Sequence, residues 1–186
     1  LAQVQQLFDA MPDTSLLARR DRAIIALLVL TGMRSDAVAS IRLKHVDLDG
    51  RRILQDATEI RVKNAKSQTT RWFPFGDPFD QTLVDWVSEL RDLNALPDDA
   101  LFPPDEVINA PYRIRRDDRE PIAPWQTDGP VRRVVRQACK RAGLPYFNPH
   151  AFKHFVASMS DSYCTSSEQR RGWSHNLGHE NEALTR

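Results

Sequence analysis

Apolar residues recur at the three- and four-residue spacing of an α-helix over most of the chain. The longest apolar run, from Ala23 to Leu30, lies within a predicted helix over residues 16–31. This helix is apolar on most of its sides, so we expect it to be the central buried helix, with Gly32 as its C-terminal cap. Further helices are predicted over residues 2–11, 35–42, 79–93, 129–142, 149–160 and 166–176.

Residues 52–75 follow a different pattern. They contain three short runs rich in β-branched and aromatic residues, RRILQ, EIRVK and RWFPF, which are typical of strands. The sequence therefore predicts a mainly α fold with a small three-stranded antiparallel sheet, an α+β class. The proline-rich residues 101–125 predict a long loop, anchored by Leu101, Phe102 and Tyr112.

Length, composition and charge are those of a globular domain, and they do not by themselves indicate a function. The length of 186 residues suits a single domain over 1–186, and 41% apolar residues are enough for a core. A net charge of +1 does not by itself indicate a nucleic-acid partner. The two cysteines form neither a disulfide framework nor a metal-ligand spacing, which favours a reduced, cytosolic protein. No apolar run approaches the roughly 20 residues of a membrane span, and no signal-peptide pattern is present.

The stretch from Asn148 to Glu180 holds the most suggestive chemistry. His150 and Lys153 lie three residues apart, on one face of a predicted helix, and His179 closes a Leu-Gly-His triplet. An imidazole and a fixed cation on one face suit the binding of a phosphate. Two such residues alone do not establish a phosphate site. The case becomes informative only if the rest of the chain supplies further cations.

Two basic residues before this stretch are candidates to supply them. Arg34 directly follows the end of the central helix, where it is well placed to be held rigid, although, taken alone, a surface arginine that caps helix carbonyls is the more common case. Lys66 lies at or beside the tip of a predicted hairpin. A lysine there is usually solvated, but it would reach a cleft if the hairpin folds over a ligand.

The predicted helix over 129–142 carries a basic stripe without an acidic residue. Its members recur at spacings of three and four: Arg132, Arg133, Arg136 and Lys140. A solvated helix normally mixes both signs of charge, so the stripe favours a polyanionic partner such as DNA, with a merely solubilising face as the alternative.

Taken together and in this order, the pieces resemble the catalytic domain of the tyrosine recombinases, the phage-integrase family. The resemblance covers nearly the whole chain. Its motifs are TGMRSDAVASIRLKHVDL around Arg34, a hairpin Lys66 eight residues before Pro74, HAFK at His150 and Lys153, and NLGHE at His179. Each motif alone is weak, but four in order are fairly specific.

The resemblance implies a definite chemistry. In this family a tyrosine attacks a DNA phosphodiester and forms a 3′-phosphotyrosyl link, which the 5′-hydroxyl of a partner strand reverses without metal or other cofactor. By analogy, Arg34, His150, Lys153 and His179 would surround the scissile phosphate, and Lys66 would be the general acid. The basic stripe would contact the DNA backbone. The expected partners are double-stranded DNA and further copies of the protein, as a tetramer on two duplexes, in a bacterial cytoplasm.

Three features depart from the family pattern. Lys153 stands where an arginine is usual, and Ala37 stands where an acid is usual, with Asp36 beside it as a possible substitute. The tyrosine is expected shortly after His179, past Arg186, and the N-terminal DNA-clamping domain of the family is expected before residue 1. A degenerate relative that binds DNA without cutting it stays open as an alternative, as does a helical interaction domain unrelated to DNA.

Overall fold

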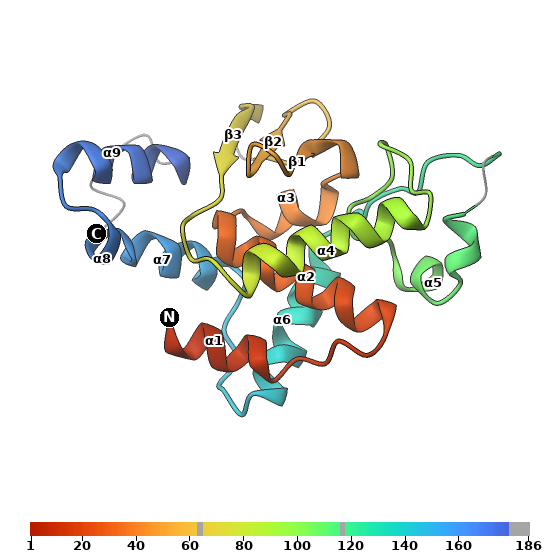
Figure 1. The fold of residues 1–186 in the computed structure, drawn as a ribbon, viewed down its shortest axis with the longest axis horizontal. Helices are drawn as coiled ribbons and strands as arrows, with labels where there is room; N and C mark the ends of the chain where they lie inside the picture. The colour runs from red at the N-terminus through yellow and green to blue at the C-terminus, as the bar shows by residue number, and fades with distance from the viewer. Residues whose placement is uncertain (63–64, 116–117, 179–186) are drawn as a thin grey trace.

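The central element of the fold is the helix α2 (Leu16–Thr31), as the sequence predicts (Figure 1). The computed structural model describes residues 1–62, 65–115 and 118–178. The Ser15 hydroxyl caps α2 by accepting a hydrogen bond from the Ala18 amide, and every residue from Ala23 to Thr31 is buried. Gly32 ends the helix in the left-handed conformation, with φ of 59°.

Several other helices pack against α2. Helix α4 crosses one side of it, and α3, α6 and α7 contact it as well (Figure 1). The bounds of the other helices are α1 (Ala2–Asp9), α3 (Ser35–Ser40), α4 (Phe79–Asp92), α5 (Asp105–Ile108), α6 (Gly129–Arg141), α7 (His150–Ser158), α8 (Ser160–Tyr163) and α9 (Ser167–Asn176). Leu43–His45 and Pro111–Arg113 are short 3-10 helices. In that part of the chain, no helix is both long and apolar enough to cross a membrane.

The predicted three-stranded antiparallel sheet is confirmed, but its strands differ from the predicted ones. They are β1 (Val46–Asp47), β2 (Arg52–Gln55) and β3 (Gln68–Arg71), in the order β1-β2-β3. Only β2 matches a predicted run. The described part of EIRVK, residues 59–62, is not a strand, because the Asp56 carboxylate accepts hydrogen bonds from the backbone amide and hydroxyl of Thr58 and starts a turn there.

The predicted strand RWFPF is also mostly wrong, since β3 ends at its first residue, Arg71. The chain then leaves the sheet. The Phe73 amide donates to Leu30 O near the end of α2, at 2.7 Å, and Pro74 has no amide hydrogen to give to a ladder. Phe73 and Phe75 are buried in the core instead.

Residues 101–125 form a connection that contains α5 and the short helix Pro111–Arg113. Leu101 and Phe102 are buried anchors, as predicted. The prediction for Tyr112 is wrong, because this side chain is 63% exposed.

Candidate functional site

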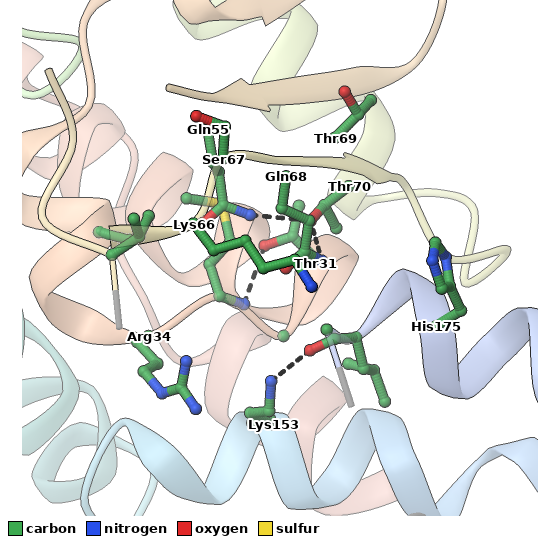
Figure 2. A pocket seen from close by; sticks show the side chains of 16 residues that line it. Thr31, Arg34, Gln55, Lys66, Ser67, Gln68, Thr69, Thr70, Lys153 and His175 are labelled. Atoms are coloured by element: carbon green, nitrogen blue, oxygen red, sulfur yellow. Dashed lines mark hydrogen bonds between the residues drawn. The ribbon is translucent and has the colours of Figure 1, made fainter. Parts of the chain in front are cut away.

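A cleft of about 730 Å³ lies between the sheet, the start of α3, α7 and the end of α9. Three of the predicted site residues line it: Arg34, Lys66 and Lys153. They come from three distant segments, since Arg34 is the N-cap of α3, Lys66 lies two residues before β3 and Lys153 is in α7. Figure 2 shows the Lys66 chain entering from the sheet side, with Arg34 and Lys153 on the opposite wall.

Lys153 is the most constrained of these cations. Its side chain is 7% exposed, and its ammonium donates a hydrogen bond to the Leu177 carbonyl oxygen (Figure 2). The aliphatic stem is therefore packed in the protein while the charged end reaches the cleft wall. This contact joins α7 to the residue that follows α9.

His150 is exposed and lies at the edge of this arrangement rather than in the lining of the cleft. Its ring packs edge-to-face on His154, with 4.5 Å between the ring centroids. Partial burial, and next the neighbouring His154, Lys153 and Arg34, lower the pKa of His150 below its ordinary value. The lowered pKa favours a neutral imidazole at neutral pH.

His179 lies outside the described residues. The two residues before it, Leu177 and Gly178, line the cleft. Gly178 has φ of +72°, a conformation that favours glycine, and a Cβ there would lie 2.3 Å from the Gln68 side-chain oxygen Oε1.

The cleft also contains polar residues that the sequence reasoning missed, namely His175, Gln55, Gln68 and Thr70. The Thr70 hydroxyl accepts hydrogen bonds from the side-chain amides of Gln55 and Gln68, at 2.8 and 3.1 Å (Figure 2). His175 had one available signal, its position four residues before His179 on a predicted helix. The glutamines had none, because their place depends on the sheet register.

Asp36 does not take the place of the missing acid. Ala37 is buried and lines the cleft, whereas the Asp36 side chain is 59% exposed and pairs with Arg61 at 3.7 Å. The described cleft lining therefore includes no carboxylate.

The basic stripe lies on the exposed face of α6, opposite the buried valines. Neighbouring acids balance part of its charge: Arg132 donates to Asp128 at 2.7 Å, and Arg133 donates to Asp105 at 2.8 Å. Arg136 lies over the Tyr146 ring, 5.0 Å from its centroid. Asp128 also accepts from the Ser35 hydroxyl at 2.6 Å, which links the start of α6 to the segment that carries Arg34.

Comparisons with known proteins agree on one family. The sequence matches the Phage integrase family over residues 1–186. It is 32% identical to the tyrosine recombinase XerC of Corynebacterium efficiens over 149 residues, which is 80% of this chain and 40% of that protein. It is 29% identical to XerC of Azotobacter vinelandii over 183 residues, 98% of this chain and 52% of that protein.

Solved structures share the fold. The XerA recombinase superposes with a TM-score of 0.68 at 19% identity, covering 99% of this chain and 55% of that one. The lambda integrase catalytic core superposes with a TM-score of 0.62 at 16% identity, covering 96% of this chain and 92% of that one. The chain thus spans about half, or less, of the curated relatives it matches and nearly the whole of an isolated catalytic core.

Proposed function

The chain belongs to the phage integrase family, and we propose that it is the catalytic domain of a site-specific DNA recombinase, which cleaves and rejoins strands through a 3′-phosphotyrosyl intermediate. The observation that carries the proposal is the convergence of Arg34, Lys66 and Lys153 on one cleft, from segments far apart in the sequence. These cations surround a cleft whose described lining has no carboxylate. They can therefore stabilise the negative charge that develops on a phosphodiester in the transition state.

The residues divide the chemistry between them. Arg34, Lys153 and His150, together with His179, bind the non-bridging oxygens of the scissile phosphate. A tyrosine hydroxyl attacks phosphorus, the bond to the 5′-oxygen breaks, and Lys66 gives that oxygen a proton, which an arginine could not do. The tyrosine proton passes to the acceptor nitrogen of a neutral His150 imidazole, while the other ring nitrogen donates its N–H to the phosphate. The lowered pKa of His150 favours this neutral form. Rejoining is the reverse, so no bond energy is lost.

The wider assembly belongs to the same proposal. The nucleophilic tyrosine is one that follows Arg186, and a DNA-clamping domain precedes residue 1. The substrate is double-stranded DNA, with Arg132, Arg133, Arg136 and Lys140 against its backbone. Two duplexes are held by a tetramer in the bacterial cytoplasm, at the nucleoid.

A second function is favoured by a specific observation. Lys153 donates to the Leu177 carbonyl and lacks the planar fork of arginine, and Ala37 provides no acid. Both features fit a relative that binds DNA without cleaving it.

The decisive experiment uses the chain extended through the codons that follow Arg186 in its gene. The extended protein is incubated with a nicked suicide duplex that carries its attachment site. A protein–DNA band that survives boiling in detergent is the expected result, and Arg34→Ala should abolish it. DNA binding without any covalent band would instead support the second function.

A further inference from the structure

Strand β3 is the outer strand of the sheet, so the backbone groups on its free edge need partners. Asn176, the last residue of α9, supplies them at Arg71. The Arg71 amide donates to Asn176 Oδ1 at 2.8 Å, and Asn176 Nδ2 donates to the Arg71 carbonyl at 2.8 Å. The side-chain amide therefore pairs with β3 as a neighbouring strand would.

Asn176 holds β3 at a second point. Its backbone carbonyl accepts a hydrogen bond from Gln68 Nε2 at 2.9 Å. Gln68 and Arg71 are the two ends of β3, and Gln68 lies two residues after Lys66. One residue of α9 thus fixes the strand that follows the hairpin lysine at both its ends.

Helix α9 is itself firmly attached to α7. The Trp173 indole nitrogen donates to the Val156 carbonyl at 2.9 Å, and the Trp173 ring contacts Phe73, with 4.5 Å between centroids. The residue after Asn176 is Leu177, whose carbonyl accepts from Lys153. The contacts of Asn176 therefore connect the wall of the cleft that carries Lys66 to the wall that carries Lys153.

We propose that Asn176 is a positioning residue, which clamps β3 to α9 so that the Lys66 ammonium is aimed at the leaving 5′-oxygen while Lys153 holds the same phosphate. This inference rests on the proposed function and deepens it. Alanine at this position keeps the backbone carbonyl that binds Gln68, and the strand keeps its ladder with β2. The alanine variant loses both hydrogen bonds at Arg71, so β3 is held to α9 at one end instead of two. Proton donation, rather than phosphate binding, is the step that should suffer.

The test compares two leaving groups in the extended protein. One suicide duplex carries the ordinary bridging 5′-oxygen, and the other carries sulfur there, which leaves as a thiolate and needs no general acid. Asn176→Ala should lower the cleavage rate on the ordinary duplex about tenfold or more, as part of the 10²–10⁴ that a general acid contributes. On the sulfur duplex its rate should return close to the wild-type rate.

Matched variants separate positioning from general damage. Lys66→Ala should show the same recovery on sulfur, and Arg34→Ala should stay slow on both duplexes. Asn176→Asp keeps the acceptor for the Arg71 amide and loses the donor, so an intermediate rate is expected. Asn109→Ala, an exposed asparagine at the end of α5, serves as the matched control and should cleave as the wild type does.

The two ideas fail in distinguishable ways. A wild-type protein that cleaves neither duplex overturns the proposed function and this inference with it. Wild-type cleavage that Asn176→Ala leaves unchanged, or that it slows equally on oxygen and sulfur, overturns the inference alone.

Discussion

Replacing Gly32 by alanine tests how closely the end of the central helix approaches the cleft. Gly32 has φ of +59°, and a Cβ there would lie 2.7 Å from Leu177 Cδ2, 3.5 Å from Val156 Cβ and 3.6 Å from Lys153 Cα. Gly143 has nearly the same conformation, φ of +66°, with nothing within 4 Å of its Cβ position. The two glycines therefore share the conformational cost of alanine and differ in the steric one.

The expected magnitudes follow from this difference. The left-handed conformation costs an alanine about 1–2 kcal/mol, which both variants should lose. The contact with Leu177 is shorter than carbon atoms tolerate, and the Leu177 side chain is buried and has little room to shift. Gly32→Ala should therefore lose a further 1–3 kcal/mol, about the cost of overpacking a core. Because the displaced residue is the acceptor for Lys153, the Gly32 variant should also lose DNA cleavage.

Equilibrium urea unfolding measures both free energies of unfolding directly. Gly32→Ala should be less stable than Gly143→Ala by more than 1 kcal/mol, with an unchanged denaturant slope. Equal losses in the two variants would refute the reasoning, since they would show that the approach to Leu177 has no energetic weight.

Three other perturbations have defined outcomes. Lys153→Met keeps the stem but leaves the Leu177 carbonyl without this donor, so urea unfolding should show a loss of about 1–3 kcal/mol. A bound phosphate favours protonated His150, whose pKa in the free protein is lowered. DNA affinity, measured by fluorescence anisotropy, should therefore rise toward acid pH, and His150→Gln should flatten this dependence. Arg136→Ala and Lys140→Ala should each reduce the salt slope of DNA affinity by about 0.9.

A different result would contradict each of these three predictions. Unchanged stability of Lys153→Met would show that the hydrogen bond to Leu177 contributes nothing net. A pH dependence that survives in His150→Gln would assign the proton to another group. An unchanged salt slope would place the α6 face away from the DNA backbone and favour its solubilising role.

The helices were predictable because their signals are local. A run of apolar residues, a serine cap and a glycine stop define α2 within its own segment. The strands were less predictable, since their limits depend on competing partners. Asp56 binds Thr58 and breaks the second predicted strand, while Leu30 takes the Phe73 amide away from the sheet.

The candidate site was predictable where motifs carry it, and unpredictable where it depends on docking. The resemblance pointed to Arg34, Lys66 and Lys153, which line one cleft. It did not indicate Asn176, whose contact with Arg71 joins residues 105 apart in the sequence. It also treated the α6 stripe in isolation, whereas Asp128 at the N-cap of α6 and Asp105 in α5 balance two of its arginines.

The C-terminal end of α2 explains how segments so far apart reach one cleft. Gly32 lies two residues before Arg34, and a Cβ added to it would lie only 3.6 Å from the Cα of Lys153 in α7. The Leu30 carbonyl accepts from the amide of Phe73, just after the strand that follows Lys66. The segments that carry all three cations are thus positioned by the same buried turn at the end of α2. The carbonyl end of a helix also carries a partial negative charge, which offsets the repulsion among cations gathered there before any phosphate binds. Substitutions at this end of α2 should therefore reduce cleavage more than equally destabilising substitutions at its start.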